Sequence, residues 1–261
     1  MRAGAGQPLF PLARARALIL GSLLVLAAAA WAVLVWQSSM TDMDDVGNML
    51  TMDMGAPLFL AIWMAMMVAM MFPTAAPMIL TFASVQQNKQ KRGKPYVPTW
   101  VFVSSYLAIW MTFGVLAYVA ALGATELADN SMWFMDNAAR IGAGVLILAG
   151  LYQLSPLKNV CLSKCRAPMN FVLTSWRDGT VGALRMGLGH GLYCLGCCWL
   201  FFVIVFPLGM MNVAILAVIV LLIFAEKSLP FGPRASQLAA VVLVGYGTLV
   251  MFVPDALPTA M

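Results

Sequence analysis

The chain contains repeated apolar stretches that are long enough to cross a lipid bilayer. A helix needs about 20 mostly apolar residues to span the hydrocarbon. Seven such stretches occur in the 261 residues: 17–36, 57–84, 99–122, 138–154, 187–206, 211–225 and 236–253. Apolar residues make up 62% of the chain and charged residues only 10%, whereas soluble domains carry roughly a quarter charged residues. We therefore expect an all-α, polytopic membrane helix bundle of about seven transmembrane helices.

The basic residues indicate the orientation of this bundle. If the N-terminus is cytoplasmic, 14 of the 15 basic residues fall on the cytoplasmic side, with Arg140 as the exception, as the positive-inside rule favours. The net charge of +5 then reflects topology, and we expect the lipid bilayer and no nucleic acid as a partner. The predicted location is the bacterial inner (cytoplasmic) membrane. The first stretch also has features of a cleavable secretory signal, and cleavage would leave the remaining topology unchanged.

One segment, 186–199, concentrates side chains that bind soft metals. It holds the only histidine and three of the five cysteines of the chain. On a helix, four of its residues form one narrow stripe, with Cys198 beside it: Met186, His190, Cys194 and Cys197. A single buried histidine or cysteine usually serves packing. Their coincidence within a membrane span, where ionisable residues are commonly functional, favours metal ligation or redox chemistry.

A second cysteine pair lies in the predicted cytoplasmic loop 155–185. Cys161 and Cys165 are at i and i+4 and have basic neighbours, which favour the thiolate form. In a reducing compartment such a pair indicates a metal or redox site more than a structural disulfide. Zinc would still lack two of its four ligands here.

Methionines occur in two further places. In the second stretch, Met64, Met67 and Met71 share one helix face ahead of Pro73 and Pro77, and broken helices near the midplane mark binding sites in transporters. Methionine also fills gaps in ordinary cores, so packing is the alternative. The external loop 37–56 is rich in methionine and aspartate, including Met52 and Met54, and could be a low-affinity metal collector or a flexible acidic loop.

The predicted organisation has three parts. Residues 1–56 form the first span and the Met/Asp-rich external loop, residues 57–253 form a metal-binding transmembrane bundle with the cytoplasmic Cys loop 155–185, and residues 254–261 form a short external tail. Glu226 and Lys227 end the sixth stretch, where we expect a local ion pair or a helix-end anchor.

Several motifs together resemble a bacterial family of predicted metal-binding integral membrane proteins. The resemblance covers about residues 57–231 and rests on these motifs: Trp63-Met-Ala-Met-Met, Met71-Phe-Pro with Pro77, Tyr152-Gln-Leu-Ser-Pro-Leu-Lys-Asn-Val-Cys161 with Cys165-Arg, His190-Gly-Leu-Tyr-Cys194-Leu-Gly-Cys-Cys-Trp199, Met211-Asn212 and Glu226-Lys227. One branch of the family is associated with copper supply to a tyrosinase-like enzyme. The resemblance therefore implies metal handling, with copper as the first choice of metal.

These observations lead to one main hypothesis. Thioether, thiol and imidazole groups suit Cu(I), so we expect a metal homeostasis protein that passes Cu(I) across or within the membrane to an exported acceptor. Zinc is the alternative metal, and a metal donor or acceptor protein is the expected partner. The sequence has no nucleotide-binding loop, so any movement would be driven by a gradient or a partner.

Two alternatives remain open. The cysteines could form a transmembrane thiol-disulfide conduit, although the spacing of Cys194, Cys197 and Cys198 would strain an intrahelical disulfide. The protein could also be a structural or assembly subunit whose cysteines are bystanders. We expect no enzyme, since no catalytic serine, paired-carboxylate or phosphate-cradling motif is present.

Overall fold

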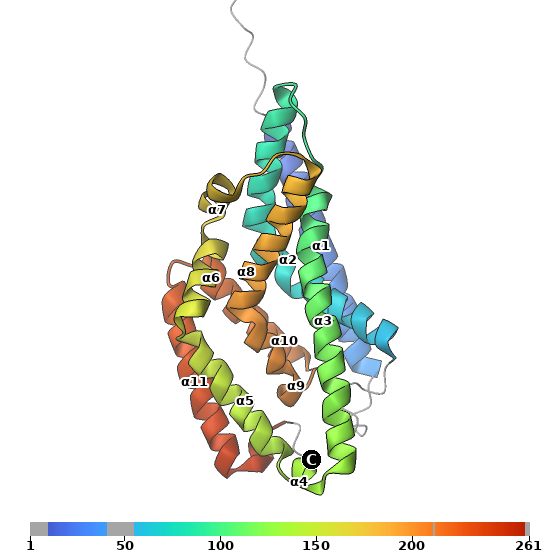
Figure 1. Cartoon of the computed structure of the whole chain (residues 1–261), viewed down its shortest axis with the longest axis vertical. Coiled ribbons are helices and arrows are strands. Elements are labelled where there is room, and N and C mark those ends of the chain that lie inside the picture. Colours follow the sequence, from blue (N-terminus) through green and yellow to red (C-terminus); the bar gives the residue numbers. More distant parts are fainter. Residues whose placement is uncertain (1–9, 41–54, 211, 259–261) are drawn as a thin grey trace, which may run out of the picture.

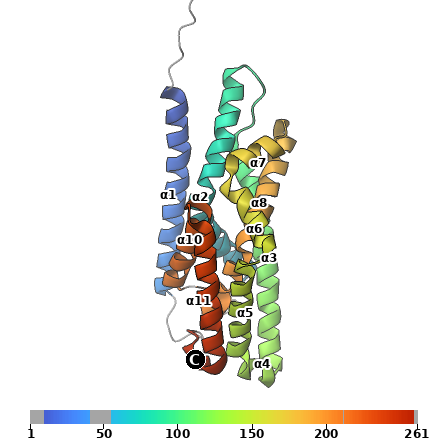
Figure 2. The same cartoon turned by 90° about the vertical axis from the view of Figure 1, so that its left-hand side faces the viewer.

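The computed structural model describes residues 10–40, 55–210 and 212–258. Most of the external loop 37–56, including Met52 and Met54, lies outside the described residues, so its predicted role stays a prediction. All regular structure within the described residues is helical (Figures 1 and 2). In chain order the elements are α1 (Phe10–Met40), α2 (Ala56–Lys91), α3 (Thr99–Asn130), α4 (Met132–Asp136), α5 (Ala138–Gln153), α6 (Pro156–Arg166), α7 (Pro168–Ser175), α8 (Gly179–Val203), α9 (Val205–Leu208), α10 (Val213–Ser228), α11 (Gly232–Phe252) and the 3₁₀ turn η2 (Pro254–Ala256).

The long helices run roughly along one axis of the molecule. Helices α2, α3 and α8 form its central part, and α1 packs on α2 at the periphery (Figures 1 and 2). Helices α5 and α11 form an antiparallel pair on the other side. Glycines bring this pair close together, because a Cβ atom on Gly150 would lie 3.0 Å from Ala240 O and one on Gly247 would lie 2.9 Å from Ala143 O.

Five described helices are long and apolar enough to cross a membrane: α1, α2, α3, α8 (continued by α9) and α11. A sixth crossing is formed if α5 and α6, which meet at a bend of 62°, count as one broken span. The bend follows from local sequence, since Ser155 caps α6 by accepting a hydrogen bond from Lys158 N and Pro156 occupies the first helical position. Helix α10, predicted as a span, has 16 residues and is therefore only about 24 Å long.

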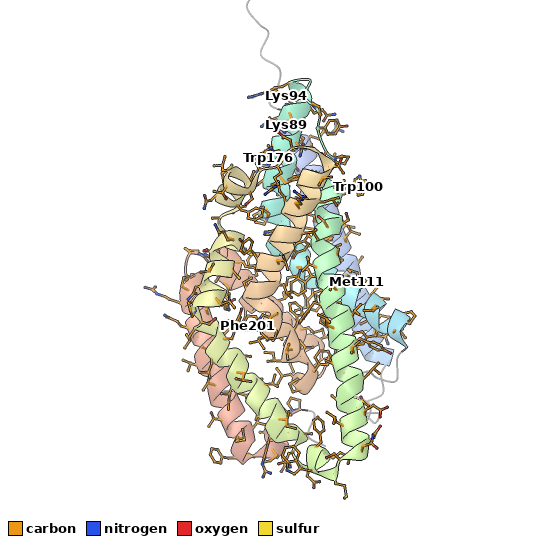
Figure 3. All side chains as sticks on the ribbon, in the orientation of Figure 1. Lys89, Lys94, Trp100, Met111, Trp176 and Phe201 are labelled. Atoms are coloured by element: carbon orange, nitrogen blue, oxygen red, sulfur yellow. The ribbon has the colours of Figure 1, made fainter. Side chains whose placement is uncertain are left out.

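Charged residues occur at both ends of the long axis. Lys89 and Lys94 lie at the end where α2 leads into α3 (Figure 3). Glu126 and Asp129 belong to the opposite end of α3, which is followed by Asp136 in α4.

Candidate metal centre

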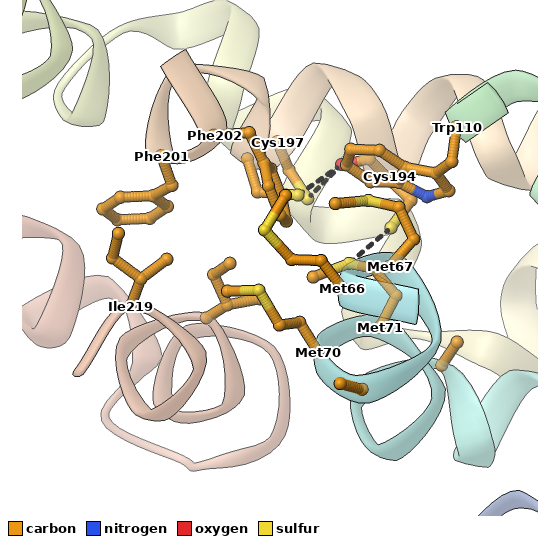
Figure 4. Close-up of a cluster of buried hydrophobic side chains, with 14 of the residues drawn as sticks. Met66, Met67, Met70, Met71, Trp110, Cys194, Cys197, Phe201, Phe202 and Ile219 are labelled. Carbon is orange, nitrogen blue, oxygen red and sulfur yellow. Dashed lines mark hydrogen bonds between the residues drawn. The ribbon is translucent and has the colours of Figure 1, made fainter. Parts of the chain in front are cut away.

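Sulfur atoms from three helices converge in the middle of the bundle. Cys194 Sγ on α8 lies 3.9 Å from Met71 Sδ on α2 (Figure 4), and Cys197 Sγ on α8 lies 3.9 Å from Cys165 Sγ on α6. Cys194, Cys197, Cys198 and Met71 are at most 2% exposed, whereas Cys165 is partly exposed. We call these five residues the sulfur cluster.

Hydrogen bonds distinguish the three cysteines of α8. The Cys197 and Cys198 thiols both donate to the Cys194 carbonyl oxygen, at 3.1 and 2.9 Å. Such bonds to the carbonyl three or four residues earlier keep both sulfurs close to the helix. Cys194 Sγ instead points at the side chains of other helices, namely Met71, Tyr106 and Lys227. Cys194 is therefore the best placed of the three thiols for binding a ligand between helices.

The five methionines in the first half of α2 divide into two groups. Met66, Met67, Met70 and Met71 are at most 2% exposed, and Figure 4 shows them gathered beside Cys194 and Cys197. Met64 lies elsewhere, on a groove of about 640 Å³ between α1 and α2. The structure thus brings Met67 and Met71 of the predicted trio near the cysteines, while Met66 and Met70 were not among the predicted site residues.

Helix α2 is not interrupted at its prolines. It continues through Pro73 and Pro77 to Lys91, although we expected a broken helix there. Two threonine hydroxyls in this part of α2 donate to backbone carbonyls, from Thr74 to Met71 O at 3.0 Å and from Thr81 to Pro77 O at 2.7 Å. The carbonyl groups that Pro73 and Pro77 leave without their usual amide donors are those of Ala69 and Pro73, so these two hydroxyl bonds do not replace the lost ones.

Glycines allow α3 and α6 to approach α8 closely. A Cβ atom on Gly187 would lie 2.4 Å from Phe102 O of α3, and one on Gly196 would lie 2.7 Å from Cys161 Sγ of α6. Cys161, which is 9% exposed, therefore lies directly against α8. The predicted loop 155–185 is in fact largely helical, and this explains how both of its cysteines reach α8.

Two polar side chains that the sequence analysis did not assign to the site contact the sulfur cluster. Tyr106 Oη on α3 lies 3.1 Å from Cys194 Sγ, and Lys227 Nζ on α10 lies 3.0 Å from the same sulfur. The expected ion pair between neighbouring Glu226 and Lys227 is not what the structure shows. The rarity of charged side chains inside membrane segments is the signal by which Lys227 could have been found.

Glu226 pairs instead with Lys158 of α6. Lys158 Nζ lies 2.7 and 2.8 Å from the two carboxylate oxygens, and the Ser236 hydroxyl donates to Glu226 Oε1 at 3.0 Å. Arg166, at the other end of α6, donates to Glu226 O and Leu229 O. These bonds hold both ends of α6, and with it Cys165, against the end of α10.

His190 and Met186 are buried on α8, each 2% exposed. The imidazole packs against the rings of Phe102, Tyr106 and Phe171, with centroids 5.6–6.0 Å away. His190 Nδ1 has no hydrogen-bond partner within the described part of the chain. Tyr106 contacts both His190 and Cys194 and so links the histidine to the sulfur cluster. Neither His190 nor Met186 is a hydrogen-bond partner of the cluster sulfurs in the described part of the chain.

Comparison with known proteins places these residues in a family. The family model PpoB2, described as a copper chaperone, matches residues 60–250. The chain belongs to the PpoB2 copper chaperone family. The resemblance seen in the sequence is thereby confirmed, and it connects the chain to copper handling. No curated protein and no solved structure matches the chain.

The part that matches PpoB2 contains the whole cluster and its surroundings. It begins within α2 and ends within α11, and therefore includes Met71, Cys165, Cys194 and Lys227 but not α1. The described residues contain no group of three or more His, Cys, Asp or Glu side chains arranged to hold a metal ion. The sulfur cluster of this PpoB2 family member consists of four thiols and one thioether, which are soft donors.

Proposed function

We propose that this protein binds Cu(I) at the sulfur cluster and passes it, across or within the bacterial inner membrane, to an exported acceptor protein. The observation that carries the proposal is the convergence of Cys194 and Met71 at 3.9 Å, with Cys165 and Cys197 beside them. Three separate helices supply these sulfurs. Thiolates and thioethers are the ligands that a soft cation such as Cu(I) prefers.

The proposed topology keeps the N-terminus in the cytoplasm. The five long helices, the broken α5–α6 span and the short α10 would together make the seven predicted crossings. The end of the molecule that carries Lys89 and Lys94 then faces the cytoplasm. Buried Met67 and Met71 on α2 and the cysteines of α8 would provide successive sulfur ligands, so that the cation need not enter the hydrocarbon unliganded.

The test is the copper content of protein purified anaerobically after growth with copper, measured by plasma mass spectrometry. We expect about one copper or more per chain in the wild type and a large loss in Cys194→Ser. The control is Ala183→Ser, which also places a hydroxyl on α8 at a fully buried position but leaves every sulfur in place. Equal copper in Cys194→Ser and Ala183→Ser would refute the proposed site.

The thioether ligand is tested in the same way. Met71→Leu should lower copper content, whereas Met78→Leu should not, because Met78 is similarly buried on α2 but lies about two turns away. Equal retention of copper in both variants would show that Met71 only fills space.

A second candidate function is the thiol-disulfide conduit, and the Cys165–Cys197 sulfur distance of 3.9 Å is the observation that favours it. Disulfide exchange needs close approach of thiols, which this pair provides. A conduit would stay active after copper is chelated and would lose activity on thiol alkylation. A copper carrier would lose activity under both treatments, so the two functions are separable.

A further inference from the structure

Lys227 is a buried cation whose nearest polar partners are sulfur atoms. The residue is 8% exposed, and its Nζ lies 3.0 Å from Cys194 Sγ, 3.9 Å from Met71 Sδ and 4.0 Å from Cys198 Sγ. The adjacent carboxylate of Glu226 is bonded by Lys158 and Ser236. The ammonium group therefore lies where three sulfurs of the cluster converge.

A cation in this position and a copper ion would use the same sulfur lone pairs. Copper bound between Cys194 and Met71 would stand within a few ångströms of Nζ as the side chain now lies, and two positive charges at such distances repel strongly in a low-dielectric interior. Copper can enter only if the ammonium group moves aside.

The position of Lys227 in the fold permits that movement. The residue lies in the last turn of α10, just before the segment 229–231 that leads to α11. Its side chain is a flexible four-carbon stem, and the carbonyl end of a helix is a favourable place for a cation.

We infer that Lys227 is a displaceable place-holder for Cu(I): its ammonium group occupies the metal position in the copper-free protein and leaves it when copper binds. The inference rests on the proposed function and adds a means of release. With Cys194 as a thiolate in both states, one monovalent cation replaces another and no proton is released. The net charge of the buried site then stays constant, which limits the cost of either state inside a membrane. A tethered competitor also lowers copper affinity, which a protein that hands copper on requires.

The first test compares Lys227→Leu with Lys227→Arg. Copper affinity and release rate are measured anaerobically by competition with a chromogenic Cu(I) chelator. Lys227→Leu removes the competing charge and should bind copper roughly tenfold more tightly or better, with slower release. Lys227→Arg keeps a tethered cation and should not tighten binding. Weaker or unchanged binding in Lys227→Leu, or equal tightening in both variants, would overturn the inference.

The second test uses the wild-type protein and does not depend on any variant folding. Labelling of lysine amines is followed by mass spectrometry with and without Cu(I). Labelling of Lys227 should rise when copper is bound, while labelling of the fully buried, ion-paired Lys158 should stay low. Unchanged or reduced labelling of Lys227 in copper-loaded protein would contradict the inference. Failure of the wild type to bind copper would instead refute the proposed function itself.

Discussion

Lys158 of α6 and Glu226 of α10 form a fully buried ion pair, with Nζ 2.7 Å from Oε1 and side chains only 0% and 2% exposed. Glu226 directly precedes Lys227 on α10, and Lys158 is three residues before Cys161 on α6. The ion pair therefore joins the helix that supplies Cys165 to the helix that supplies the cation of the sulfur cluster. The cluster depends on this junction because α6 begins only after a 62° bend in the chain.

The first prediction concerns this ion pair. Lys158→Met should lower the free energy of unfolding by about 3–5 kcal/mol, because it leaves a buried carboxylate without its cation. Unfolding of the copper-free protein in detergent measures the change. Lys158→Met combined with Glu226→Gln should recover part of the loss. The control Lys89→Met breaks a more exposed pair with Asp178 and should cost far less, because an exposed ion pair is screened by solvent. An equal cost in both single variants would contradict the prediction.

The second prediction concerns the contact between α6 and α8. Gly196→Ala would place a Cβ atom 2.7 Å from Cys161 Sγ, so the Cys161 side chain or α6 must shift. We expect a loss of about 1–3 kcal/mol in unfolding free energy together with reduced copper content. Gly189→Ala is the matched control, since a Cβ atom there meets nothing within 4 Å. A Gly196→Ala variant as stable and as copper-rich as Gly189→Ala would show that this approach of the helices is unimportant.

The third prediction concerns Cys165 and Cys197. Their sulfurs are 3.9 Å apart, so a small shift would allow a disulfide of about 2.05 Å to form. We expect diamide to link the two residues in copper-free protein, detected by peptide mass spectrometry, and Cu(I) loading to slow the linkage. Cys161→Ser should leave the linkage unchanged. Equal rates of linkage with and without copper would argue that these thiols do not take part in metal binding.

The fourth prediction concerns pH at the predicted cytoplasmic end. Lys89 bonds to Asp178 and Trp176 Nε1 donates to the same oxygen at 2.9 Å, and together they hold the pKa of Asp178 below its ordinary value. Because the folded-state pKa is lowered, this contact stabilises the folded protein above the unfolded pKa of about 3.9 and is lost as the pH falls through the lower folded value. Trp176 fluorescence should therefore change in that acidic range.

The control for the pH experiment is Asp178→Asn, which should abolish the acidic step in Trp176 fluorescence. Asp129→Asn, at the opposite end of α3, should leave the step in place. A step that persists in Asp178→Asn would mean that another group titrates near Trp176.

The 3.6-residue period of an α-helix made it possible to predict from the sequence which residues of α8 share its buried face. Cys194 and Cys197 do lie on the buried face of a long apolar helix, and the all-helical class follows from the apolar stretches. The number of crossings could not be obtained in this way, because α10 and α5 are each 16 residues long and composition alone does not tell a short buried helix from a short span.

The partners of α8 could not be predicted either, because they depend on tertiary packing. Helix α2 is apolar on nearly every side, so periodicity could not separate Met71, which faces the cysteines, from Met64, which lies on the groove next to α1. The approach of Cys165 depends on the bend before α6 and on its ion pair. Lys227 follows a carboxylate in sequence, and only the fold shows that Glu226 is already paired with Lys158.

The most direct test of copper binding at the sulfur cluster is the X-ray absorption spectrum of the protein loaded anaerobically with copper. We expect an edge typical of Cu(I) and scattering from sulfur ligands, with a clear loss of sulfur scattering in Cys194→Ser. A spectrum dominated by nitrogen and oxygen ligands, or one identical in wild type and Cys194→Ser, would contradict the site described here.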